Sequence, residues 1–240
     1  QAELAARVTS RLNAVERVGV KYAGRSQSEV IESVLAGDMD NIRSTTESLD
    51  AAAFDTAVDI LLQAKTVYVV GIRSCAPLAE FLSFYLNMIR GGIVLLKTTS
   101  LSEVLEQMLR VGEQDAVVGI SFPRYSMRTL KALEFANDRN ARVITITDSV
   151  HSPMCLYSSC NLFAASDMVS IVDSLVAPLS VINALVVALC LKQPQTVRDS
   201  LESLEGVWNN YQISEQDEID RIDEDSLFSL PGKRRLPESG

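Results

Sequence analysis

The sequence is poor in the residues that build zinc sites and disulfide frameworks. It has one histidine, His151, and four cysteines, none of which form a CxxC pair. A structural zinc site needs four such ligands at close spacing, so these counts argue against a metal centre. Scattered cysteines in an acidic chain without a secretory leader favour reduced thiols and a cytoplasmic location. No metal or other cofactor is expected.

A surplus of positive charge is also missing. Lysine and arginine total 22 against 31 aspartates and glutamates, which gives a formal net charge of -9. Such a chain repels phosphate backbones at long range, so direct DNA binding by these residues is not expected. The 240 residues are 47% hydrophobic, which is enough for the core of one large domain.

Uninterrupted apolar runs long enough to cross a membrane are scarce. The best candidate, residues 174–192, contains Pro178, Ser180 and Asn183. It is barely long enough to span hydrocarbon. We interpret it as a helix buried in a large sheet domain or at a subunit interface, and we expect no membrane partner.

Apolar runs of five or six residues, rich in valine and isoleucine, alternate with helical patterns through the middle of the chain. Such runs are typical of parallel strands buried on both faces. They predict an α/β fold: a three-layer α/β/α domain with a five-stranded parallel, flavodoxin-like sheet of order 2-1-3-4-5, preceded by N-terminal helices. The predicted strands are 66–71, 93–97, 115–120, 142–148 and 160–166. The predicted helices are 2–18, 26–47, 51–65, 75–90, 101–110, 126–140, 174–192 and 196–212, with capping boxes at Ser26/Glu29 and Ser100/Glu103 and an Asp50 cap.

Composition divides the chain into three expected parts. Residues 1–49 are predicted to be a helical linker and dimerisation segment, and 50–212 the sheet domain. Residues 213–240 are predicted to be an acidic, mobile tail, because they are polar and have no periodic core face.

The loops 71–75 and 121–126 form the expected ligand site. In an open parallel sheet of this order, ligands bind beyond the carboxyl ends of the strands, between the first and the third. Both loops lead into helix N-termini, where backbone N–H groups and the helix dipole favour an anion. The expected ligand-binding residues are Gly71, Arg73, Ser74, Cys75, Ser121, Arg124, Tyr125 and Ser126.

Arg73 and Arg124 are the strongest of these candidates. Each guanidinium can make a forked, charge-assisted contact to phosphate or carboxylate, although an arginine in a loop can also be only a surface charge. Ser126 can equally serve only as a helix cap. Cys75 is either a reactive thiol at a helix N-terminus or a small residue that fits under the loop, and the second interpretation is preferred.

Two acidic residues lie at the same edge of the predicted sheet. Asp148 and Asp173 could bind ligand hydroxyls or cap helices. Gly71 is expected to let the backbone turn sharply at the end of its strand.

The two loops and their flanking helices resemble the sugar isomerase (SIS) domain, in the form found in RpiR-type bacterial transcription regulators. The resemblance covers nearly the whole chain. Residues 51–86 are similar to the entry of that domain, 120–149 to its second half and 173–189 to its last helix. Residues 1–18 are similar to the segment that follows an N-terminal helix-turn-helix in this family, so the DNA-reading domain is expected to be missing from this chain.

The resemblance implies an effector-sensing, dimerising domain that binds a phosphorylated sugar or a related small anion and controls DNA through the missing module. In the family, the first loop commonly ends in a phosphate-binding serine, and Cys75 stands at the matching position. The second loop commonly reads Ser-x-Ser-Gly-x-Ser/Thr. Here Pro123 and Arg124 stand at the positions of its middle serine and its glycine.

A sugar-phosphate isomerase on the same fold is the alternative function. Aldose–ketose isomerisation needs a base beside a carbonyl, and isomerases of this fold usually supply a glutamate and a histidine. Only His151 is available here, and Glu80 is expected on a face away from the crevice, so no enzymatic activity is expected. A third possibility is a ligand-free protein whose arginines bind acidic groups of a partner. A homodimer is expected, because predicted helices 75–90 and 174–191 carry more apolar surface than one sheet face needs.

Overall fold

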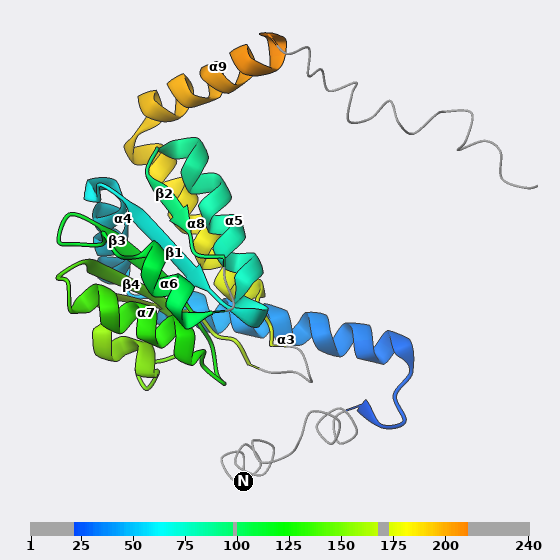
Figure 1. Cartoon of the computed structure of the whole chain (residues 1–240). Helices are drawn as coiled ribbons and strands as arrows, with labels where there is room; N and C mark the ends of the chain where they lie inside the picture. The colour runs from blue at the N-terminus through cyan, green and yellow to red at the C-terminus, as the bar shows by residue number, and fades with distance from the viewer. Residues whose placement is uncertain (1–21, 98–99, 168–172, 211–240) are drawn as a thin grey trace, which may run out of the picture. The chain divides into compact units, whose positions relative to one another are not determined.

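The computed structural model describes residues 22–97, 100–167 and 173–210 (Figure 1). The predicted helix 2–18 and the predicted tail lie outside these residues, and the three-part division of the chain stays a prediction. By its internal contacts the chain separates into two units, and the boundary in the sequence lies between Pro194 and Gln195.

A five-stranded parallel sheet forms the centre of the first unit. Its strand order is β2-β1-β3-β4-β5, as predicted. The strands are β1 (Val67–Gly71), β2 (Ile93–Leu95), β3 (Ala116–Ile120), β4 (Arg142–Thr147) and β5 (Cys160–Phe163). Every residue of β1 and β3 is buried, which fits strands with helices on both faces. The last residues of these two strands, Gly71 and Ile120, are register partners, so the loops that follow leave the sheet side by side.

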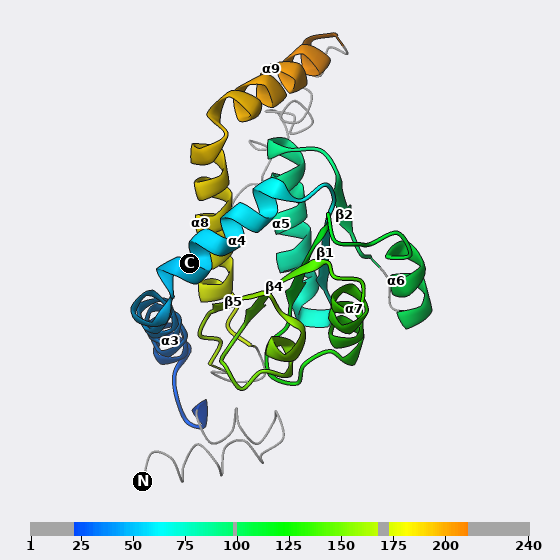
Figure 2. The same ribbon diagram turned by 90° about the vertical axis from the view of Figure 1, so that its left-hand side faces the viewer.

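Helices cover both faces of this sheet, which confirms the predicted three-layer α/β/α class (Figure 2). On one face lie α4 and α5, and α8 packs against both of them and against α3. On the other face lie α6 and α7. The helices are α3 (Gln27–Ser48), α4 (Ala51–Gln63), α5 (Ala76–Ile89), α6 (Leu101–Gln107), α7 (Met127–Asn137), α8 (Val176–Lys192) and α9 (Pro194–Asn210), with 3-10 turns η1 (Arg73–Cys75) and η2 (Pro153–Tyr157).

Two of the three predicted helix N-caps are confirmed. Ser26 and Glu29 form the expected capping box of α3. The Asp50 carboxylate accepts hydrogen bonds from the first turn of α4. The predicted capping box of α6 is wrong, because Ser100 makes no side-chain capping bond and its hydroxyl lies 2.8 Å from Ser102 Oγ.

Several element ends differ from the sequence-based expectation by one to three residues, among them the end of β5 and the start of α5. Strand β5 ends at Phe163, three residues early, because the chain turns there to α3, where the Ala165 N–H donates to Thr45 Oγ1 at 2.8 Å. The helix expected from residue 75 begins at Ala76. It is preceded by the 3-10 turn η1, whose first residue, Arg73, has a positive φ of 63°.

Helix α8 corresponds to the apolar segment 174–192, the best candidate for a membrane span in the sequence. Within the described residues, no single helix is long and apolar enough to cross a bilayer; by length and composition alone, α8 and α9 pass that test only when they are counted together. Six residues of α8 are buried against the rest of the first unit.

Candidate functional site

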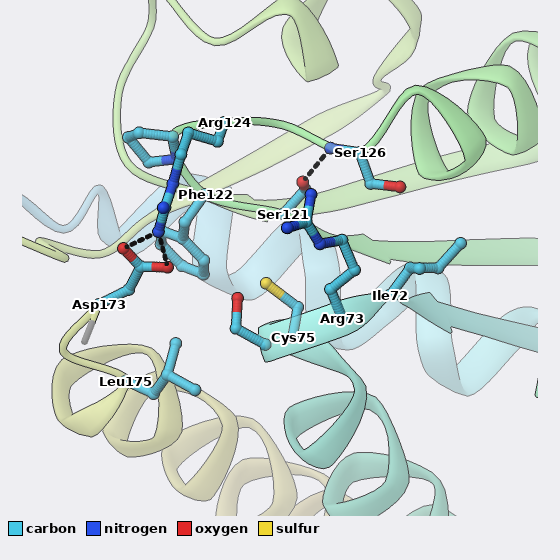
Figure 3. A pocket seen from close by; sticks show the side chains of 11 residues that line it. Ile72, Arg73, Cys75, Ser121, Phe122, Arg124, Ser126, Asp173 and Leu175 are labelled. Carbon is cyan, nitrogen blue, oxygen red and sulfur yellow. Dashed lines mark hydrogen bonds and ion pairs between the residues drawn. The ribbon is translucent and has the colours of Figure 1, made fainter. Parts of the chain in front are cut away.

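A pocket of about 240 Å³ opens between the loops that follow β1 and β3 (Figure 3). The strand order reverses between these two strands, so this is the position at which parallel sheets bind ligands. Its walls are Ile72, Arg73, Ser74, Cys75, Ser121, Phe122, Pro123, Arg124, Ser126, Asp173 and Leu175. The structure thus brings six of the expected ligand-binding residues together: Arg73, Ser74, Cys75, Ser121, Arg124 and Ser126. It leaves Gly71 and Tyr125 outside the lining.

Arg73 is the positively charged side chain that is free to meet a ligand. Among the described residues that line the pocket, it has neither a hydrogen-bond nor an ion-pair partner, and it extends towards Ser121 (Figure 3). Its backbone is left-handed, with φ at 63°. A residue with a Cβ pays about 1 kcal/mol or more for that conformation, and such strain gathers at functional sites.

Arg124 has the same backbone conformation but a different electrostatic partner. Its φ is 69°, and it stands where the resembling family commonly has glycine, the residue that adopts this conformation freely. Its Nη2 lies 3.0 and 3.1 Å from the two carboxylate oxygens of Asp173. The side chain of Asp173 is only 10% exposed, whereas that of Arg124 is 55% exposed. Arg124 therefore reaches the pocket as half of an ion pair.

The serine hydroxyls of the second loop hold the loop as well as line the pocket. Ser121 Oγ accepts a hydrogen bond from the Ser126 N–H at 3.1 Å. Ser126 Oγ caps α7 by accepting from the Thr129 N–H at 3.3 Å. A hydroxyl that accepts one bond still has a hydrogen to donate. Ser126 is thus a helix cap that also belongs to the pocket lining, and its part in ligand binding stays a prediction.

Most backbone N–H groups at the start of α5 are already engaged. The Cys75 N–H lies 3.4 Å from the Ile72 carbonyl oxygen, the Ala76 N–H bonds to Arg73 O, and Pro77 has none. The expectation that backbone N–H groups would bind the anion is thus weakened on this side of the pocket. The polar groups left for a ligand belong mainly to side chains.

The thiol of Cys75 is buried, and this decides between its two interpretations. Burial raises the pKa of the Cys75 thiol, an effect that contacts with the Phe122 backbone and Ser74 only partly oppose. A thiol with a raised pKa is a poor nucleophile at neutral pH. Burial and the raised pKa favour the preferred interpretation, in which Cys75 is a small residue that fits under the loop.

Gly71 packs closely against η1, whose residues line the pocket. A methyl group at its Cα would lie 2.5 Å from the Cys75 carbonyl oxygen and 3.0 Å from Ala79 Cβ. Its φ is not in the left-handed range. The expected sharp turn is therefore not the reason for glycine here, and the reason is the close approach of η1.

Tyr125 and Asp148 pair with each other rather than line the pocket. The Tyr125 hydroxyl donates to Asp148 Oδ1 at 2.7 Å. Burial, with this carboxylate as the second cause, raises the pKa of Tyr125 to about 12. Glu80 lies outside the pocket lining too, with its carboxylate 3.1 Å from Lys97 Nζ, and so does the exposed His151.

Sequence reasoning did not assign the apolar wall or the role of Asp173. Phe122 and Leu175 supply apolar side chains on opposite sides of the opening (Figure 3). An apolar residue two positions after the end of a strand, as Phe122 is after Ile120, was the available signal for this wall. Asp173 had been expected to bind hydroxyls or cap a helix, but the helix N-cap is Leu175. The charged residues of the lining are two arginines and one aspartate, and within the described residues no cluster of three His, Cys, Asp or Glu side chains could hold a metal ion.

Comparison with known proteins places the fold among sugar isomerase domains. Residues 60–188 match the family model described as SIS domain. The chain is 26% identical over 203 residues to the HTH-type transcriptional regulator HexR of Escherichia coli, which covers 77% of this chain and 66% of that protein. The chain therefore spans a little under two thirds of this relative.

Solved structures show the same relationship. The sugar isomerase domain of an RpiR transcription factor from Sphaerobacter thermophilus is 26% identical, with a TM-score of 0.71 over 74% of this chain and 98% of that one. The Vibrio vulnificus NanR protein, solved in complex with ManNAc-6P, has the same fold at 18% identity, with a TM-score of 0.67 over 81% of this chain and 72% of that one. Sugar-phosphate isomerases also have this fold.

Proposed function

The chain belongs to the SIS domain family, in the form found in RpiR-type regulators, and we propose that it is the effector-sensing domain of such a regulator. The effector is a phosphorylated sugar or a related small anion. The observation that supports this most directly is the unpaired Arg73 guanidinium in a pocket at the sheet's switch point. In this proposal, DNA is read by the helix-turn-helix part of such a regulator.

The chemistry of the pocket suits a sugar phosphate. Arg73 can hold a phosphate through charge-assisted hydrogen bonds, with hydroxyls from Ser74 and Ser121 at the same opening. The side chains of Phe122 and Leu175 offer an apolar surface for the carbon face of a sugar ring. The phosphorylated sugar in the solved NanR complex supports this class of ligand.

A sensor fits the site better than an isomerase. Among the described residues that line the pocket there is no histidine and no glutamate, which are the bases that isomerases of this fold usually use. Proton transfer needs a base within hydrogen-bond reach of the substrate. The carboxylate that the lining does contain, Asp173, is paired with Arg124, which favours binding over proton transfer.

A ligand screen tests this function. We expect one phosphorylated sugar from a panel of hexose 6-phosphates and pentose 5-phosphates to raise the melting temperature, because ligand bound only to the folded state stabilises it by mass action. At a concentration of 100 times Kd the stabilisation is about 2.7 kcal/mol. The matched unphosphorylated sugar is the control. Equal binding of the free sugar would contradict the proposal, and so would conversion of the bound aldose to a ketose, followed by NMR.

We propose in addition that the domain is a homodimer through the outer face of α5 and α8. Phe84 on α5 is 62% exposed, and Val187 and Leu191 on α8 are exposed as well. The Phe84 ring lies edge-on to Tyr85 with 5.1 Å between centroids, which extends the apolar face. A helix that is apolar on nearly all sides, as α8 is, is typical of burial between subunits.

Charge on this face is expected to separate the subunits. Phe84→Glu should shift the mass in sedimentation equilibrium from twice that of the chain to that of the chain, because a carboxylate would have to be buried at the interface. Leu156→Glu is the matched control, since Leu156 is 76% exposed and lies on η2, away from α5 and α8. A wild-type monomer at micromolar concentration would refute the interface, and so would dissociation by both variants.

A further inference from the structure

The ion pair between Arg124 and Asp173 joins the pocket to a segment far away in the sequence. Arg124 follows β3, whereas Asp173 lies just before α8, 49 residues later. Figure 3 shows the Asp173 carboxylate at the pocket, facing the Arg124 guanidinium. A carboxylate that is 10% exposed depends on its counter-ion, because burial without one strongly disfavours the charged form.

Asp173 is followed directly by a residue that is bonded to α3. The Ser174 hydroxyl donates to Asp38 Oδ1 at 2.6 Å. The Ser174 carbonyl oxygen accepts from the Ser166 hydroxyl at 2.9 Å. Ser166 and Ser174 are both buried, so these bonds hold the start of α8 against α3 and the end of β5.

The residues of α3 that are hydrogen-bonded to this region lie on one face of the helix. Asp38, Asn41 and Thr45 are spaced three and four residues apart, which places them on one side of a helix. Thr45 Oγ1 accepts from the Ala165 N–H at 2.8 Å, and Asn41 Oδ1 accepts from the Asp167 N–H at 3.4 Å. Ala165 and Asp167, which precede Asp173, and Ser174, which follows it, are thus hydrogen-bonded to the same face of α3.

An anion in the pocket competes with Asp173 for Arg124. A phosphate held by Arg73 and Arg124 places negative charge beside the Asp173 carboxylate, and like charges at short range in a partly buried site repel strongly. Asp173 would lose its counter-ion at the same moment. Repulsion then drives the carboxylate away from the anion, and this movement pulls on Ser174.

We propose that an anionic effector displaces Asp173 from Arg124, and that the displacement reaches α3 through the Ser174–Asp38 hydrogen bond. This inference rests on the proposed function, because it uses the same pocket. Helix α3 leads towards the N-terminal side of the chain, where RpiR-type regulators carry the DNA-reading domain. Asp173 is a positioning residue that couples occupancy to α3, and it also lowers the affinity for anions.

Asp173→Asn in the full chain tests the competition, with inorganic phosphate and the panel of sugar phosphates as probes. The variant keeps the shape of the side chain and removes its charge. We expect anions to bind at least tenfold more tightly in isothermal titration. Asp40→Asn is the matched control, because it removes an exposed α3 carboxylate that pairs with Arg43 outside the pocket, and its affinity should stay within twofold of wild type.

Ser174→Ala tests the coupling separately. This variant should bind anions within threefold of wild type, because Ser174 does not line the pocket. In wild-type protein, the bound anion should raise amide hydrogen exchange at residues 38–45 at least threefold, measured by mass spectrometry. Both variants should lose this increase in exchange. Ser174→Ala removes the hydrogen bond to Asp38, and Asp173→Asn removes the charge that the anion would displace.

The outcomes separate this inference from the proposed function. If wild type binds a sugar phosphate but Asp173→Asn binds it no more tightly, the displacement is wrong and the sensor function stands. If neither protein binds any anion, both fail. An α3 response that persists in Ser174→Ala overturns the coupling alone. Circular dichroism and the second variant Asp173→Ser guard against misreading a folding defect as a loss of binding.

Discussion

Arg73→Ala is expected to weaken the binding of a phosphorylated sugar about a hundredfold, as measured by isothermal titration. Arg73 is the guanidinium at the pocket that has no partner among the described residues, so its hydrogen bonds are available to the ligand. Charge-assisted hydrogen bonds contribute about 1.5–3 kcal/mol. A loss of about 2.7 kcal/mol corresponds to a hundredfold change in Kd.

The substitution isolates the side chain from the backbone. Alanine keeps the Cβ and therefore the same cost at the left-handed φ, so the free energy of unfolding without ligand should change little. Lys97→Ala is the matched control for a general charge effect, because Lys97 is an exposed cation that pairs with Glu80 outside this pocket. Binding that stays within threefold of wild type in Arg73→Ala would show that the anion sits elsewhere.

Gly71→Ala is expected to lower the free energy of unfolding by about 3 kcal/mol, as measured by urea denaturation. The added methyl would lie 2.5 Å from the Cys75 carbonyl oxygen. That atom belongs to the backbone and cannot rotate away as a long side chain could. Overpacking typically costs 1–3 kcal/mol, and a backbone obstacle beneath the pocket places this site at the upper end. Ligand affinity should fall as well, because η1 must shift.

Gly112→Ala serves as the control for the change of residue type. No atom lies within 4 Å of a methyl group at that position, and its φ is not left-handed. Removing a glycine there should change stability by less than about 1 kcal/mol, in the stabilising direction, through the unfolded chain. Equal destabilisation by both variants would mean that the contact with Cys75 is not the cause.

The fold and the position of the site could be predicted from the sequence because both depend on simple periodicities. Five apolar runs alternating with helices determine a parallel sheet, and the strand order 2-1-3-4-5 determines which two loops meet. The Gly71–Ile120 register confirms that these loops leave the sheet as neighbours.

The electrostatics of the site could not be predicted in the same way. The Arg124–Asp173 pair spans 49 residues of sequence, and no local pattern indicates which of several acids a loop arginine will meet. The burial that raises the pKa of Cys75 likewise depends on how loops and helices from separate parts of the chain pack around it. Both features arise from tertiary packing, which overrides the helix-terminus argument for a low thiol pKa.

The pairing of β1 with β3 determines how the pocket loses its shape on heating. Each loop begins at the end of a fully buried strand, so the spacing between the two loops is fixed by the same hydrogen bonds that hold the sheet. Regions anchored in this way open with the free energy of the whole domain rather than by local fraying. A preorganised pocket also loses little freedom on binding. Heat should therefore abolish effector recognition only at the temperature at which the sheet itself melts.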